Sequence, residues 1–320
     1  MRGLRPLLHP FVACGAALLA MSACMHITYA GAFEYPGFES VEPSWIHREK
    51  LCEPETALVL NDGTILVSNV CDFATQGTGY ISRLGSDGSL LAARFIDALD
   101  SPLGMAMHGQ KLLVVDKNTV RCFELGSAKA NLPKTNSHET NPSETSSLAL
   151  SLTTPCGQVI LPTSVANDIA VSDSGEVYVT DTVQGKVYSY SHGKAEPPAV
   201  IVAEFPGANG IAVDGNVLWV GGERLWRYTL STGDMLTVGP DWLGDIDGIE
   251  LEPTGAVQVT PVDGPVIRLV EGQVESVRGV VGAGSANHGY STHTQQAIIP
   301  TGFDNTVVAF EIPLTPDLRH

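Results

Sequence analysis

Residues 209–220 read NGIAVDGNVLWV: Asn209 precedes a short apolar run, a DGN turn and a second apolar run. Five other stretches have the same layout. The six copies begin at Glu55 (ETALVLNDGTILV), Leu103 (LGMAMHGQKLLVV), Asn167 (NDIAVSDSGEVYV), Asn209, Asp247 (DGIELEPTGAVQV) and His288 (HGYSTHTQQAII). From each leading residue to its counterpart of Val220 the spacing is 11 or 12 residues. We call these six leading residues the strand heads.

Each copy continues into a third run in which β-branched and aromatic residues alternate with polar ones, as in a β-strand with one buried face. These runs are YISRL at 80, VRCFEL at 120, VYSYS at 187, LWRYTL at 225, VIRLV at 266 and VVAFEI at 307. Weaker fourth runs follow, such as LLAARFI at 90 and AVIVAEF at 199. Six units of four strands predict an all-β fold, a six-bladed β-propeller with four-stranded antiparallel blades around a central channel.

The distances between repeats indicate one domain over residues 33–320. The counterparts of Val220 are 48, 64, 41, 39 and 40 residues apart, so a blade takes about 40 residues. The surplus in the longest interval falls in residues 126–155, which are rich in Ser, Thr, Asn and Pro and predict an exposed loop. Residues 38–45 are the candidate for an edge strand that completes the last blade.

The N-terminus predicts export. Arg2 and Arg5 precede the apolar stretch FVACGAALLAMSAC and the small residues at 30–32, which is the pattern of a signal peptide over residues 1–32. The alternative is a lipoprotein signal that ends before Cys24, because MSAC is similar to a bacterial lipobox. No other stretch is long and apolar enough for a transmembrane anchor. We therefore expect a periplasmic or secreted protein, free or tethered by lipid at Cys24.

Charge narrows the choice of partners. The formal net charge is −17, and the first 32 residues contribute two basic and no acidic side chains. A surface this acidic repels phosphate backbones and anionic lipid headgroups, which argues against nucleic acid as a partner and favours metal cations.

Four of the six cysteines follow the leader, an even number that is consistent with two disulfides in an oxidising compartment. We prefer the pairs Cys52–Cys71 and Cys122–Cys156, because each closes a loop within one repeat and the second brackets the predicted loop. Buried free thiols are the alternative.

Four of the strand heads carry side-chain oxygens: Glu55, Asn167, Asn209 and Asp247. If equivalent strands converge on one axis, these oxygens share a small volume at one mouth of the channel, an arrangement that suits a hard cation. The alternative is that Asn, Asp and Gly recur here because each strand leaves a tight turn. His288 is either a hydrogen-bonded channel residue or a proton-transfer group or ligand. Alternation points Asp168 away from the channel, which favours a turn-capping role.

The order of these repeats resembles the SMP-30/gluconolactonase-like propellers over nearly all of residues 52–313. The stretches that carry the resemblance are PETALVLNDGTILVSN, NDIAVSDSGEVYVTD, NGIAVDGNVLWV, DGIELEPTGAVQVT and PTGFDNTVVAFEI. It implies one divalent cation bound by Glu55, Asn209 and Asp247, with Asn167 touching substrate. Ca²⁺ is the first choice, with Mg²⁺, Zn²⁺ and Mn²⁺ as alternatives.

The chain departs from the sugar-lactone hydrolases of that family. Those enzymes usually have Glu-Gly-Pro before the first strand and an Arg two residues ahead of the third-blade Asn. Here Thr56 and Ala57 follow Glu55, and Val165 replaces the Arg. The substitutions predict a site without the usual clamp for sugar hydroxyls.

The leading hypothesis is an exported, metal-dependent hydrolase of a lactone or related ester, in which metal-activated water attacks the carbonyl. Asp247 would act as ligand and general base, Glu55 and Asn209 as ligands, and Asn167 as a hydrogen-bond donor that orients the substrate. GxSxG, HExxH, CxxC and Walker A patterns are absent from the sequence. The alternative function is a non-catalytic propeller that binds a protein partner.

Overall fold

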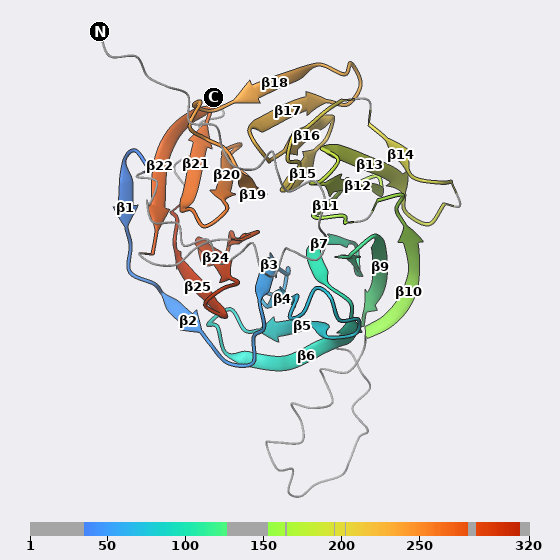
Figure 1. Cartoon of the computed structure of the whole chain (residues 1–320). Helices are drawn as coiled ribbons and strands as arrows, with labels where there is room; N and C mark the ends of the chain where they lie inside the picture. Colours follow the sequence, from blue (N-terminus) through green and yellow to red (C-terminus); the bar gives the residue numbers. More distant parts are fainter. Residues whose placement is uncertain are drawn as a thin grey trace, which may run out of the picture. The chain divides into compact units, whose positions relative to one another are not determined.

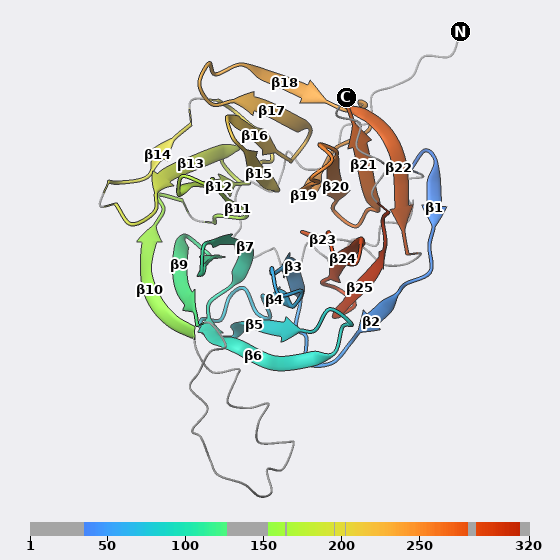
Figure 2. The ribbon, with the colours of Figure 1, turned by 180° about the vertical axis from the view of Figure 1, so that it is seen from behind.

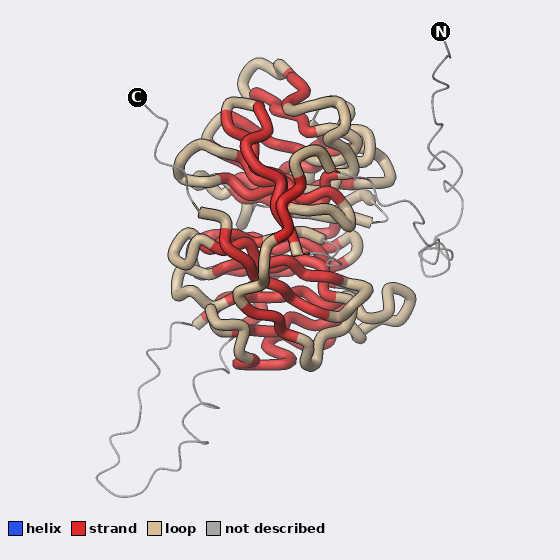
Figure 3. Tube along the Cα trace, turned by 90° about the vertical axis from the view of Figure 1, so that its left-hand side faces the viewer, coloured by secondary structure: helices blue, strands red, loops and turns tan. Residues whose placement is uncertain are grey.

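The computed structural model describes residues 35–126, 153–163, 165–194, 196–201, 203–280 and 286–313. The predicted signal peptide, with Cys24, lies outside these residues. Among the described residues the chain forms strands and loops with no helix, and none therefore that could cross a membrane (Figure 3). Six sheets surround a common axis in a six-bladed β-propeller, as the repeats predicted (Figure 1).

Each blade runs from the axis outward in four strands. The first strands are β3 (Pro54–Val59), β7 (Pro102–His108), β11 (Ile169–Val171), β15 (Ile211–Asp214), β19 (Ile246–Leu251) and β23 (Gly289–Ser291) (Figure 2). The second strands are β4 (Ile65–Asn69), β8 (Lys111–Asp116), β12 (Glu176–Asp181), β16 (Val217–Val220), β20 (Val257–Pro261) and β24 (Gln296–Thr301). The third strands are β5 (Gly79–Leu84), β9 (Thr119–Leu125), β13 (Lys186–Ser191), β17 (Leu225–Thr229), β21 (Val266–Val270) and β25 (Thr306–Glu311). The fourth strands are β6 (Leu90–Leu99), β10 (Thr153–Ile160), β14 (Ala199–Val200), β18 (Met235–Val238), β22 (Gln273–Gly279) and β2 (Trp45–His47).

The N-terminal segment closes the propeller. Strand β2 pairs antiparallel with β25, with Trp45 opposite Ala309, and so completes the sixth blade. This strand overlaps the range 38–45, in which the sequence predicts the completing edge strand, only at Trp45. A further strand that the repeats did not predict, β1 (Phe38–Ser40), adds in parallel to β22 and gives the fifth blade five strands. Both additions cover edges that would otherwise expose unpaired backbone groups.

The core lies between the blades, which explains why the second strands are apolar on both faces. On β12, Val177 and Val179 pack into the cluster shared with Leu113 of the second blade. Tyr178, on the opposite face, packs into the cluster shared with Leu218 of the fourth blade. Successive side chains of a strand point to opposite faces, so a middle blade buries both.

The two preferred disulfides, Cys52–Cys71 and Cys122–Cys156, are both present. Disulfides persist in oxidising compartments outside the cytosol, which agrees with export. The second disulfide joins β9 to β10, and β10 takes in the last three residues of the predicted 126–155 loop. Residues 127–152 of that loop lie outside the described residues.

Candidate metal and active site

The register of the blades places the four oxygen-bearing strand heads at equivalent positions. In each of these blades the residue two places after the head lies opposite the counterpart of Val220. The four pairs are Ala57↔Val67, Ile169↔Val179, Ile211↔Val220 and Ile249↔Val259. From β23 through β3, β7, β11 and β15 to β19, each first strand also contacts the next. The four heads therefore lie at the same end of the channel.

Glu55 lies in a β-bulge, because the register of β3 against β4 shifts between Pro54 and Ala57. The Thr56 hydroxyl donates to the Glu55 carboxylate, and the Thr56 N–H donates to Ser68 Oγ at 2.9 Å. Burial, and then the charge of Asp247, raise the pKa of Glu55 well above its usual value. The two carboxylates are thus near enough to repel each other.

Asp247 also lies in a bulge, between Ile246 and Gly248. The side chain of Asn209 donates a hydrogen bond to the Asp247 carboxylate, which lowers its pKa. Burial outweighs that bond and, with the charge of Asp263, raises the pKa of Asp247 to about 7. None of the groups that shift the pKa values of Glu55 and Asp247 is a cationic side chain. The two carboxylates therefore form an environment that favours a cation.

Two amide oxygens of the strand heads have no hydrogen-bond donor. The Oδ1 atoms of Asn167 and Asn209 are buried and have no partner. The Asn167 side-chain nitrogen donates to Thr182 Oγ1 at 2.9 Å, which fixes the amide. A buried acceptor without a donor costs about 1–3 kcal/mol. Oxygen ligands of this kind, beside Glu55 and Asp247, fit Ca²⁺ or Mg²⁺.

The proposed donor set differs from a cluster of ionisable ligands. In the described part of the chain, no group of three or more His, Cys, Asp and Glu side chains is arranged to hold a metal. The set here is instead the two carboxylates of Glu55 and Asp247 and the amide oxygen of Asn209. Such a set favours hard cations over Zn²⁺, which prefers nitrogen and sulfur.

Asp168 belongs to the same acidic cluster, contrary to the turn-capping role that alternation suggested. It is 4% exposed, and its Oδ2 accepts the Ile211 N–H at 2.9 Å. Its carboxylate also accepts hydrogen bonds from the Ile169 N–H and the Asn287 side chain, yet burial raises its pKa to about 7. Strand alternation does not predict the direction of the Asp168 side chain, because β11 begins only at Ile169 and Asp168 precedes the strand. Asp168 links three blades across the axis.

Glu250 is a further carboxylate that the repeats did not single out. Burial, and then the charge of Asp168, raise its pKa to about 8, although its carboxylate accepts the Tyr290 N–H. It lies three residues after Asp247 on β19. The repeat pattern did not find it because it is a single acidic residue within an otherwise ordinary strand.

In the sixth blade, the residue that bridges to the neighbouring first strand lies one position before His288, the strand head that the repeats predict. Asn287, rather than His288, bridges to Thr56 and donates to Asp168. His288 lies between blades five and six, where its Nδ1 is 3.1 Å from Thr260 Oγ1. Its Nε2 is buried without a partner, and burial lowers its pKa to about 3, so the imidazole is neutral.

Glycines after the heads allow the blades to approach closely. A Cβ added to Gly210 would lie 2.4 Å from the backbone oxygen of Asp247. We expect Gly210→Ala to destabilise the protein by roughly 2 kcal/mol or more, because backbone atoms must shift. Gly302→Ala is the control, since its nearest atom, Pro54 O, is 3.4 Å away. Urea unfolding measures both variants, and equal midpoints would contradict the expected clash.

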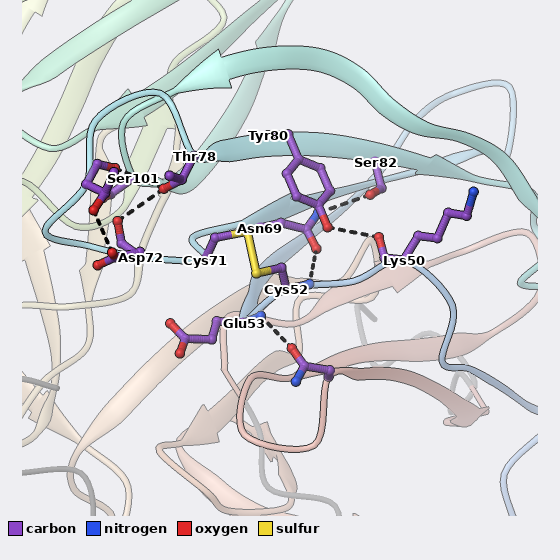
Figure 4. Close-up of a disulfide and its surroundings, with 12 residues drawn as sticks. Lys50, Cys52, Glu53, Asn69, Cys71, Asp72, Thr78, Tyr80, Ser82 and Ser101 are labelled. Atoms are coloured by element: carbon purple, nitrogen blue, oxygen red, sulfur yellow. Dashed lines mark hydrogen bonds between the residues drawn. A yellow bond between two sulfur atoms is a disulfide. The ribbon is translucent and has the colours of Figure 1, made fainter. Parts of the chain in front are cut away.

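The Cys52–Cys71 disulfide fixes the segment that leads into Glu55 (Figure 4). The Cys71 N–H donates to Cys52 O, and the Val70 N–H donates to Glu53 O. The Cys52 N–H donates to Asn69 Oδ1 (Figure 4). Glu53 and Cys71 both have positive φ, 48° and 59°. The disulfide therefore constrains a backbone turn two residues before a proposed ligand.

We expect the two disulfides to differ in their effect on cation binding. Replacing either pair by serine should cost about 3 kcal/mol of stability. Only Cys52→Ser/Cys71→Ser should also weaken Ca²⁺ binding, by roughly tenfold, because only that pair adjoins Glu55. Calorimetric titration of both double variants, at a temperature where each is folded, measures this difference. Equal Ca²⁺ affinities would show that the first disulfide has no part in positioning Glu55.

Comparison with known proteins supports the fold. A gluconolactonase from Xanthomonas campestris superimposes with a TM-score of 0.59 at 16% sequence identity, covering 83% of this chain and 88% of that one. A virginiamycin B lyase from Staphylococcus aureus, solved as a catalytically inactive variant with quinupristin, superimposes with a TM-score of 0.51 at 12% identity, covering 81% and 80%. No protein-family model and no curated protein matches the sequence. The resemblance to gluconolactonase-like propellers is thus confirmed at the level of the fold.

Proposed function

We propose that the protein is an exported, divalent-cation-dependent hydrolase of a lactone or related ester. The observation that carries this proposal is the pair of buried, donor-free amide oxygens of Asn167 and Asn209 beside two mutually repelling carboxylates. Glu55, Asn209 and Asp247 would hold the cation, for which Ca²⁺ is the first choice. The gluconolactonase among the structural neighbours makes a lactone the first substrate class to test.

A bound divalent cation supplies Lewis-acid polarisation of a carbonyl and lowers the pKa of a neighbouring water. The residues of the chain contribute orientation and proton transfer. Asp247, ionised and steadied by the Asn209 amide, can accept a proton from an attacking water. Asn167 offers a fixed acceptor oxygen, so it suits a hydroxyl or N–H of the substrate, rather than the donor role expected from sequence.

Purified mature protein tests the proposal directly. We expect one tightly bound divalent cation per chain by elemental analysis, and turnover of at least one member of a panel of lactones and aryl esters. Removal of the cation by EDTA should abolish turnover, and Ca²⁺ should restore it. Stoichiometric cation with no turnover on the panel would favour the alternative, a non-catalytic propeller that binds a partner protein.

A further inference from the structure

Large exposed apolar side chains have an uneven distribution over the described residues. Ten such residues are exposed. Seven lie on the outermost strands, namely Phe38, Ile46, Leu91, Ile160, Val200, Met235 and Leu236. The remaining three, Val183, Val262 and Phe303, are 71%, 47% and 63% exposed and lie on turns between a second and a third strand. Among the described turns at the opposite face, none carries an exposed large apolar residue.

Turns between second and third strands are at the mouth where the strand heads lie, because the second strand returns to the end from which the first departs. Two of these turns are bonded to the segments that lead into proposed ligands. The Val262 N–H donates to Asp245 O at 2.8 Å, two residues before Asp247. Asn305 Oδ1, in the turn that carries Phe303, accepts the Glu53 N–H at 2.7 Å, two residues before Glu55.

Val262 and Phe303 therefore belong to adjacent blades and lie at the mouth of the channel that holds the candidate site. We call these two residues the apolar rim. Both side chains are exposed, and their turns are hydrogen-bonded to the segments that precede Asp247 and Glu55.

Acidic residues accompany the apolar rim. Asp263 follows Val262, and Asp304 follows Phe303. Partial burial, and then the charge of Asp304, raise the pKa of Asp263, and the charge of Asp263 contributes to the raised pKa of Asp247. The mouth thus combines apolar tips with negative charge. That combination attracts uncharged or cationic apolar molecules and repels anions.

Val165, two residues before Asn167, provides no polar group at the mouth of the channel. Val165 is 9% exposed and packs into the core between the second and third blades. The opening therefore lacks a side chain there that could bind several hydroxyl groups, and it presents hydrocarbon at the rim instead.

We propose that the apolar rim of Val262 and Phe303 binds the hydrocarbon substituent of an uncharged, alkyl-bearing lactone whose ring carbonyl faces Glu55 and Asp247. This inference rests on the proposed function and names its substrate class. Apolar contact at the rim then selects the alkyl group, and the acidic mouth disfavours anionic substrates and the carboxylate product.

The test uses the Ca²⁺-loaded full mature chain and γ-lactones that carry hydrogen, butyl or hexyl at the γ-carbon. We expect kcat/KM to rise roughly twofold to fourfold per methylene, as for hydrocarbon leaving water. Val262→Ala/Phe303→Ala should reduce that rise to below about 1.5-fold per methylene. Ile160→Ala is the matched control: it is 64% exposed on the outermost strand β10 and should retain the wild-type rise.

Calorimetry with cyclopentanone and 2-hexylcyclopentanone, which carry the ring and the alkyl group but cannot be hydrolysed, measures binding apart from turnover. Wild type should bind the hexyl ketone at least about tenfold more tightly, and the double variant should lose that preference. A preference retained by the double variant, or absent from wild type, overturns the inference even if lactones are hydrolysed. A preference lost only in the double variant upholds the inference even if no lactone is turned over, in which case the proposed function alone fails.

Discussion

Asp247→Asn is expected to weaken Ca²⁺ binding by about 100-fold or more, because it removes one of two charged ligands from a site whose third ligand is the neutral Asn209 amide. The number of charged ligands changes Ca²⁺ affinity over orders of magnitude in oxygen-ligand sites. The substitution preserves side-chain volume, and Asp247 is 8% exposed, so the blade should keep its packing. Titration calorimetry with the cation-free protein gives the affinity, and lactone turnover should fall at least in parallel.

Asp245→Asn is the matched control for Asp247→Asn. Asp245 lies on the same connecting segment, two residues earlier, but it is exposed and has a positive φ of 51°, which asparagine tolerates. We expect its Ca²⁺ affinity and stability to equal those of wild type within about twofold and 0.5 kcal/mol. Equal Ca²⁺ affinity in the two variants would exclude Asp247 as a ligand.

The architecture could be predicted because every blade repeats the same local choices. Apolar alternation in the second and third strands, Gly and Asp turns and the 11-to-12-residue spacing all point to one blade structure. The same spacing identifies Asn209 and its three equivalents, since strands of equal length that start on one axis must also bring their first residues together. The two disulfides could be predicted because each pair brackets one loop of one blade.

The features of the site that the sequence did not predict depend on the exact register of one blade relative to the next. Asp168 precedes its strand, so strand alternation does not determine its direction. A one-residue difference in the sixth blade brings Asn287 to the axis instead of His288, and no periodicity distinguishes these neighbours. The apolar rim depends on which turn of which blade bonds to the adjacent blade, which only tertiary structure determines.

In the absence of a divalent cation, the protein is expected to lose stability as the pH rises from 6.5 to 8.5. The pKa values of Asp168 and Asp247 are raised to about 7 and that of Glu250 to about 8. A carboxyl group whose pKa is raised in the folded state stabilises the folded protein fully at pH values below its unfolded pKa, which is near 4. That stabilisation disappears as the pH rises through the folded-state pKa. Over this range the loss amounts to roughly 3 kcal/mol, about half of it from Glu250.

The contribution of His288 to stability changes with pH in the opposite direction, and a range from pH 6.5 to 8.5 separates it from that of the carboxyl groups. Its pKa is lowered to about 3, so its contribution to stability is complete above about pH 6.5 and falls only at lower pH. Urea unfolding in EDTA at pH 6.5 and 8.5 measures the loss, and Glu250→Gln should reduce it by about half. Saturating Ca²⁺ should stabilise the protein more at pH 8.5 than at 6.5, since it binds the ionised carboxylates. Apo stability that stays constant or rises over this range would show that these carboxylates are already ionised and compensated without a cation.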